Sequence, residues 1–157
     1  MEEPVLTYYS RNEADTVSLA KGLKPLLKKG DIIALYGTLG VGKTAFTRAL
    51  IQSEIPNEEV PSPTFTLVQT YALKEGELFH FDLYRLEDPE EVYELGIEDA
   101  FSDGISLIEW PEKMGYILPY KKILKIEITL NGQERLFKLS SQNPDWTERL
   151  NTLNFKP

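Results

Sequence analysis

The apolar residues of the N-terminal half follow two spacings, one typical of strands and one typical of helices. Residues 6–9 and 32–36 are short apolar runs, which predict strands. Apolar residues recur at helical spacing from Ser10 to about Lys29, and a second helix is predicted over residues 45–52. We expect Ser10 to cap the first of these helices, because a glutamate follows it three residues later, as in a capping box.

The middle of the chain predicts a loop, a hairpin and a buried strand. Residues 55–63 are rich in proline and acidic residues, which favours a loop. Residues 64–73 and 77–84 are both strand-like and are separated by a short turn, so they predict an antiparallel hairpin. Residues 105–108 form an apolar run of the kind expected for a strand that is buried on both faces.

The C-terminal part predicts two helices and a second hairpin. A short helix is expected to begin at Asp88 and to end at Gly96, because a capping Asp, a proline and two acidic residues open it. Residues 123–130 and 133–139 are strand-like, and an Asn-Gly pair joins them, which is the strongest short-range signal of a hairpin. Residues 144–153 have the pattern of a helix.

The segment between the predicted strand 32–36 and the helix 45–52 carries recognisable chemistry. It reads GTLGVGKT and fits the Walker A pattern G-x-x-x-x-G-K-[ST] at every constrained position, between the strand and the helix that the pattern requires. Its glycines let successive backbone N–H groups turn inward and form an anion site at a helix N-terminus. A glycine-rich turn without a ligand is the weaker interpretation. The loop residues expected to surround a phosphate are Gly37, Thr38, Leu39, Gly40, Val41 and Gly42.

The last two residues of this pattern have separate roles. Lys43 is expected to place its charge on the β and γ phosphates of a nucleotide, and the hydroxyl of Thr44 to ligate the Mg²⁺ ion that bridges them. The chain contains no Asn-Lys-x-Asp motif for reading guanine. ATP with Mg²⁺ is therefore the predicted ligand.

Two acidic residues at strand ends are candidates for the rest of the site. Glu109 follows the apolar run 105–108, where the acid that holds magnesium commonly lies. Asp82 is the rival for this role, and if both reach the γ-phosphate, one can hold the ion while the other orients or deprotonates the attacking water. Each also has a structural interpretation: Glu109 as a solvent-facing strand end, and Asp82 as a loop cap or a partner of Arg85.

Four other residues leave alternatives open. Ser62 and Thr64 either sense the γ-phosphate, as loops of related nucleotide switches do, or form only a turn. His80 is the only histidine and the chain has no cysteine, which excludes a multi-histidine metal site within the chain and disfavours structural zinc. Trp110 is either a core anchor or an aromatic residue that faces a partner.

Composition narrows the classes of function. A length of 157 residues predicts one domain, spanning residues 1–157. The formal net charge of −8 argues against a broad basic surface for nucleic acid. No apolar run approaches the ~18 residues that a membrane helix needs, and no secretory signal pattern is present, so we expect a cytoplasmic protein.

Several segments together resemble the TsaE family, the small phosphate-loop ATPases of bacterial tRNA threonylcarbamoyladenosine biosynthesis. These segments are, in order, GTLGVGKT, SPTFTLV at residues 62–68, HFDLYR at 80–85, ELGIED at 94–99 and LIEW at 107–110. The resemblance covers nearly the whole chain, and HFDLYR and LIEW make it specific because they are not general nucleotide-binding motifs. Val41 and Ala45 depart from the usual Ala and Thr of the family, and neither removes an expected ligand.

The resemblance implies an ATP-hydrolysing accessory subunit that works with the threonylcarbamoyl transferase TsaD and its partner TsaB, and that meets tRNA through this complex. By position, it implies phosphate binding by Lys43 and the loop amides, a magnesium site formed by Thr44 and Glu109, and hydrolysis assisted by Asp82, which makes Asp82, Lys43 and Glu109 the catalytic candidates. Two further positions that in the family lie near the nucleotide are Thr16 and Arg135.

The predicted fold is α/β: a three-layer P-loop NTPase fold, with a central, mostly parallel sheet that is flanked by helices and extended by antiparallel hairpin strands. Two other functions stay open. A small-molecule kinase would use the same loop but needs an acceptor pocket and usually a lid, for which residues 88–104 leave little room. A nucleotide-gated binding module would signal through its bound state and not through turnover.

Overall fold

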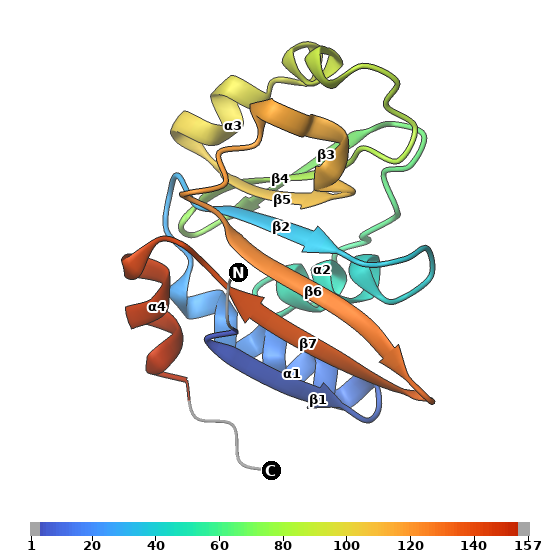
Figure 1. The fold of residues 1–157 in the computed structure, drawn as a ribbon, viewed down its shortest axis with the longest axis vertical. Helices are drawn as coiled ribbons and strands as arrows, with labels where there is room; N and C mark the ends of the chain where they lie inside the picture. Colours follow the sequence, from blue (N-terminus) through green and yellow to red (C-terminus); the bar gives the residue numbers. More distant parts are fainter. Residues whose placement is uncertain (1–3, 154–157) are drawn as a thin grey trace.

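All strands that the computed structural model describes, within residues 4–153, belong to one seven-stranded sheet (Figure 1). They are β1 (Leu6–Ser10), β2 (Ile32–Tyr36), β3 (Val68–Leu73), β4 (Gly76–Asp82), β5 (Ile105–Glu109), β6 (Leu124–Asn131) and β7 (Glu134–Ser140). Their order across the sheet is β1-β7-β6-β2-β5-β4-β3. The predicted domain of residues 1–157 extends beyond the described residues at both ends and stays a prediction.

The four central strands of the sheet are parallel, and antiparallel strands extend it at both edges. Strands β6, β2, β5 and β4 pair in parallel. At one edge β3 pairs with β4, and at the other β7 pairs with β6 and β1 with β7, all antiparallel. The α/β class and both predicted hairpins are thus confirmed. The carboxyl ends of the parallel strands meet at one end of the sheet, which is where open α/β sheets bind ligands.

Helices cover both faces of this sheet and give the three predicted layers. The α-helices are α1 (Glu13–Leu23), α2 (Lys43–Gln52), α3 (Ile97–Asp103) and α4 (Pro144–Asn151), and the short 3₁₀ helices are η1 (Lys24–Leu26), η2 (Pro89–Leu95) and η3 (Pro111–Ile117). Figure 1 shows α1 and α2 side by side behind the sheet. Within residues 4–153, no helix is both long enough and apolar enough to span a bilayer.

Strand β2 shows how the sequence builds two cores. Ile33 and Leu35 join the apolar cluster that includes α1, α2 and α4, whereas Ile32 and Ala34 join the cluster that includes α3, η2 and η3. Successive side chains of a strand point to opposite faces, so an uninterrupted apolar run requires a sheet that is covered on both sides. The central position of β2 between β5 and β6 meets this requirement.

The first helix begins and ends differently from the prediction. Its N-cap is Asn12, whose side-chain oxygen accepts a 2.9 Å hydrogen bond from the backbone N–H of Asp15. Ser10 instead ends β1, and its hydroxyl lies 2.6 Å from that of Thr16. The regular helix stops at Leu23 and continues only as η1, because proline at position 25 has no N–H to donate.

Strand β3 begins at Val68, four residues later than predicted, because a tight turn precedes it. The N–H of Leu67 donates a 2.6 Å hydrogen bond to the carbonyl of Pro63, and Leu67 has a positive φ of 70°. The carbonyl of Leu67 in turn accepts a 3.0 Å hydrogen bond from the N–H of Asp82. This turn brings Thr64 next to the end of β4, where the site described below is formed.

Candidate functional site

The phosphate loop joins β2 to α2 at the carboxyl end of the parallel strands. Gly37, Gly40 and Gly42 all have positive φ, of 155°, 77° and 114°. A Cβ atom on Gly37 would lie 2.9 Å from the carbonyl oxygen of Ile128, so only glycine fits there. Because Gly42 is the N-cap of α2 and has no side chain to bond the first N–H groups of the helix, those donors face the loop.

The ammonium group of Lys43 is folded into this loop. Its Nζ donates a 2.6 Å hydrogen bond to the carbonyl of Gly37 and lies 3.7 Å from the centre of the Trp110 ring. Burial lowers the pKa of Lys43 below its ordinary value, against the attraction of nearby carboxylates, of which Glu109 acts most strongly. An ammonium that is buried against one carbonyl and one ring retains donor capacity for an anionic ligand.

Thr44 and Glu109, the two predicted magnesium ligands, are in direct contact. The hydroxyl of Thr44 donates a 3.0 Å hydrogen bond to Oε2 of Glu109, and the same oxygen lies 2.6 Å from Nε2 of His80. Glu109 ends β5 and is only 3% exposed, so its interpretation as a solvent-facing strand end is wrong.

Asp82 ends β4 beside Glu109, and the two residues pair in register. Its Oδ2 accepts a 2.8 Å hydrogen bond from the hydroxyl of Thr64, and its Oδ1 accepts a 3.0 Å bond from the N–H of Tyr84. The hydroxyl of Ser62 lies 2.7 Å from that of Thr64. The carboxylate therefore caps its own loop, as one interpretation predicted, and also holds the loop hydroxyls toward the phosphate loop.

A cavity of about 310 Å³ lies where these groups meet. It is lined by Leu39, Gly40, Gly42, Lys43, Thr44, Ala45, Ser62, Thr64, Asp82, Glu109, Trp110 and Arg135. Gly37 and Thr38 line a neighbouring groove that also reaches Trp110, and the side chain of Val41 is buried in the core. The structure thus brings the predicted lysine, threonine and both acidic residues to one cavity.

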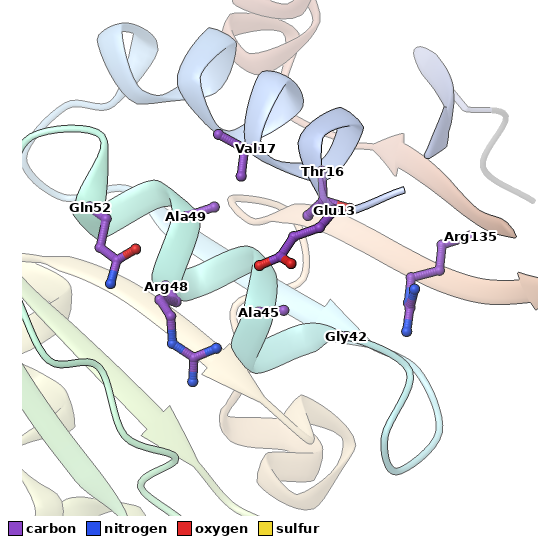
Figure 2. Close-up of a pocket in the computed structure, with 9 residues that line it drawn as sticks. All are labelled: Glu13, Thr16, Val17, Gly42, Ala45, Arg48, Ala49, Gln52 and Arg135. Atoms are coloured by element: carbon purple, nitrogen blue, oxygen red, sulfur yellow. The ribbon is translucent and has the colours of Figure 1, made fainter. Parts of the chain in front are cut away.

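A second cavity, of about 300 Å³, adjoins the first between α1 and α2 (Figure 2). Thr16 and Arg135 line it, and it shares Gly42, Ala45 and Arg135 with the cavity of the phosphate loop. Nε of Arg135 donates a 2.5 Å hydrogen bond to the carbonyl of Val41, so this arginine is anchored to the loop itself. Both residues that the family resemblance placed near the nucleotide therefore lie beside the phosphate loop.

The donor set suits magnesium better than a softer metal. Among residues 4–153 there is no group of three or more His, Cys, Asp or Glu side chains that could hold a metal ion by itself. A hydroxyl and a carboxylate in contact are hard oxygen ligands, and Mg²⁺ is usually held by one or two such groups together with phosphate oxygens and water. Thr44 and Glu109 fit this pattern.

Two contacts of the site were missed by sequence reasoning. At the level of the sequence, His80 serves only as an argument against a multi-histidine metal site, although alternation along the strand places it on the same face as Asp82. Trp110 is half-buried and packs against the core cluster that includes α3, η2 and η3, as one of its two interpretations predicts. The sequence gives no sign that its ring also contacts the ammonium of Lys43 and lies 5.0 Å, centre to centre, from that of Tyr84. Trp110 also has a positive φ of 60°, an uncommon conformation for a bulky residue.

The fold and the site together define a P-loop protein of the α/β class. The chain belongs to the TsaE family: residues 10–137 match the model described as "Threonylcarbamoyl adenosine biosynthesis protein TsaE". This confirms the resemblance that was drawn from the motifs.

Individual relatives agree with this assignment. The chain is 41% identical over 132 residues to the "tRNA threonylcarbamoyladenosine biosynthesis protein TsaE" of Rickettsia bellii, covering 83% of this chain and 92% of the relative. The protein of the same name in Haemophilus influenzae is 42% identical over 143 residues, covering 87% and 90%. A crystal structure of YdiB from Bacillus subtilis matches with a TM-score of 0.77 at 25% identity, covering 97% of this chain and 95% of that one.

Proposed function

We propose that this chain is the ATP-hydrolysing accessory subunit of tRNA threonylcarbamoyladenosine biosynthesis, acting with TsaD and TsaB. Membership of the TsaE family supports the pathway. The observation that carries the ATPase part is the 3.0 Å contact between the Thr44 hydroxyl and Oε2 of Glu109 beside the phosphate loop. A loop hydroxyl and a strand-end carboxylate are the pair with which P-loop NTPases hold Mg²⁺ on the nucleotide.

The two adjoining cavities divide the nucleotide between them. The loop N–H groups and Lys43 bind the phosphates, and Lys43 exchanges the carbonyl of Gly37 for phosphate oxygens. The nucleoside occupies the cavity between α1 and α2 that Thr16 and Arg135 line. Its volume of about 300 Å³ is at the lower end of the range for small-molecule sites.

The acidic residues perform the hydrolytic step. Mg²⁺, when bound with ATP, offsets the negative charge that accumulates on the phosphate oxygens. Asp82, fixed by its bonds to Thr64 and Tyr84, orients the attacking water and accepts its proton. The water oxygen bonds to the γ-phosphorus as the bond to the bridging oxygen breaks, which releases ADP and phosphate.

The acidic charge of the chain supports a division of labour with its partners. A net charge of −8 gives little electrostatic attraction to tRNA phosphates. TsaD and TsaB therefore supply most of the contact with tRNA, and this chain supplies ATP hydrolysis for repeated turnover.

The test is steady-state ATP hydrolysis by the purified chain, alone and with TsaD and TsaB. We expect slow hydrolysis alone, a rise with the partners, and a loss of about 100-fold in Glu109→Ala, because a buried ligand of the ion is removed. Glu77→Ala is the control, since this exposed acid near the start of β4 lines neither cavity nor the neighbouring groove. Tight ATP binding without hydrolysis in either setting would instead indicate a nucleotide-gated binding module, and a phosphorylated metabolite would indicate a kinase.

A further inference from the structure

His80 is completely buried, and its Nε2 lies 2.6 Å from Oε2 of Glu109. We propose that His80 is a positioning residue for the site: it holds the Glu109 carboxylate in the orientation that receives magnesium, and it does so without touching the nucleotide. This inference rests on the function proposed above, and it assigns His80 a role within that site.

The sheet fixes the distance between the two side chains. Strands β4 and β5 are adjacent and parallel, with Asp82 paired to Glu109 and His80 paired to Leu107. Side chains two residues apart on a strand share a face, so His80 lies on the same face as Asp82. His80 is two residues before Asp82 and is therefore further from the carboxyl end of β4. His80 is 0% exposed and is absent from the lining of the phosphate-loop cavity. It can therefore act on a ligand only through Glu109.

The hydrogen-bonding capacity of the imidazole determines the direction of the bond. An ionised carboxylate only accepts hydrogen bonds, so Nε2 carries the hydrogen and donates to Glu109. Nδ1 of His80 is buried and has no hydrogen-bond partner among the described residues. A hydrogen on Nδ1 would be a buried donor without an acceptor, which proteins avoid. We therefore assign the Nε2–H tautomer, since it leaves only the lone pair of Nδ1 without a partner among the described residues.

Thr44 and His80 both contact Oε2 of Glu109, but only Thr44 is also expected to ligate the ion. The Thr44 hydroxyl is the expected ligand of the ion, and ligation engages a lone pair of its oxygen, so this group must serve the ion as well as Glu109. His80 faces no cavity, and nothing in the nucleotide competes for its Nε2–H. Its hydrogen bond therefore keeps the carboxylate fixed when the ion binds, in the way that outer partners of metal ligands orient them.

Three replacements of His80 separate positioning from packing. His80→Gln carries an amide nitrogen at about the reach of Nε2, whereas the amide of His80→Asn reaches only as far as Nδ1. His80→Phe fills the space without a donor. Ser106→Ala is the matched control. Ser106, on the neighbouring strand β5, is polar and completely buried like His80, but its hydroxyl has no partner among the described residues.

The experiment measures equilibrium binding of a non-hydrolysable ATP analogue at a series of Mg²⁺ concentrations and in EDTA. We expect His80→Phe and His80→Asn to raise the Mg²⁺ concentration needed for half-maximal enhancement of binding by about tenfold or more, with affinity in EDTA unchanged. His80→Gln and Ser106→Ala are expected to match the wild type. Urea unfolding of the ligand-free variants shows whether each one folds.

An unchanged Mg²⁺ requirement in folded His80→Phe would overturn the proposal. If that variant does not fold, equal requirements in His80→Gln and His80→Asn would overturn it, as would an equal loss of affinity with and without Mg²⁺. Failure of the proposed function itself looks different, because the wild-type chain would then not hydrolyse ATP even with TsaD and TsaB, whatever the Mg²⁺ requirement of the His80 variants.

Discussion

The hydroxyl of Thr44 and the carboxylate of Glu109 lie 3.0 Å apart although 65 positions separate them in the sequence. One belongs to the first turn of α2 and the other to the end of β5. Their contact joins the phosphate loop to the neighbouring parallel strand. The two oxygen groups that we propose as magnesium ligands therefore lie side by side in the fold.

Replacement of Lys43 by methionine tests the phosphate loop. We expect the affinity for ATP to fall by about 10–100-fold, since charge-assisted hydrogen bonds to phosphate are lost. The ligand-free chain is not expected to lose stability, because methionine removes an ammonium group that is buried at a desolvation cost. Calorimetric titration and urea unfolding measure the two quantities. Lys29→Met, at an exposed lysine, is the control, and unchanged ATP affinity in Lys43→Met would contradict the assignment.

The lowered pKa of Lys43 predicts a pH dependence of nucleotide binding. Only the ammonium form attracts phosphate, so affinity is expected to decrease as the pH rises through the Lys43 pKa, which burial places below the ordinary lysine value of about 10.4. The stability of the ligand-free chain has the opposite pH dependence. As Lys43 loses its proton, the cost of burying its charge disappears, so the free energy of unfolding rises with pH. Lys43→Arg stays charged throughout, so a parallel loss of affinity in that variant would show that another group titrates.

Trp110 is expected to report nucleotide binding through its fluorescence. The Lys43 ammonium lies 3.7 Å from the centre of the indole ring, and phosphate binding draws that charge away. The only other tryptophan, Trp146, lies on α4, is 1% exposed and packs into the core cluster on that face of the sheet. ATP should therefore change the emission of the wild type but not that of Trp110→Phe. A retained signal in this variant would place the change at Trp146.

The ion pair between Arg149 and Asp31 predicts a large effect on stability. Arg149 donates bonds of 2.7 and 3.0 Å to the two oxygens of Asp31, which is buried, and the side chain of Arg149 is only 10% exposed. Arg149→Ala leaves a buried carboxylate without its cation and is expected to lower the free energy of unfolding by about 3–5 kcal/mol. Lys29→Ala, which breaks an exposed 3.9 Å pair with Asp103, should change it by less than about 1 kcal/mol. Urea unfolding compares the two, and equal effects would contradict this prediction.

Features that short sequence patterns specify were predicted well. The phosphate loop, the Asn-Gly hairpin and the acid at the end of β5 each depend on residues that are close in the sequence. The prediction of Ser10 as the N-cap is wrong, because serine and asparagine cap helices about equally well and the local pattern does not choose between them. The choice of Asn12 depends on β1, which holds Ser10 in register with Arg135 of β7, more than a hundred residues later.

Contacts between distant segments were the part that sequence reasoning could not supply. The bond from Arg135 to the carbonyl of Val41 and the contact of His80 with Glu109 depend on which strands become neighbours. Strand order is a property of the whole sheet and leaves no local pattern. The placement of Arg135 near the nucleotide came from the family resemblance alone, and the contact of His80 with Glu109 came only from the structure.

The assembly of the site from three elements has a consequence for the folding equilibrium. Thr44, Asp82 and Glu109 belong to α2, β4 and β5, so a ligand that contacts all three binds only chains in which the centre of the sheet is complete. By mass action, a ligand present at about 100 times its dissociation constant adds about 2.7 kcal/mol to the free energy of unfolding. The amides of β2, β4 and β5 are therefore expected to exchange hydrogen more slowly, and together, when such a ligand is bound. In a cell where the ligand is abundant, its binding would stabilise the folded sheet.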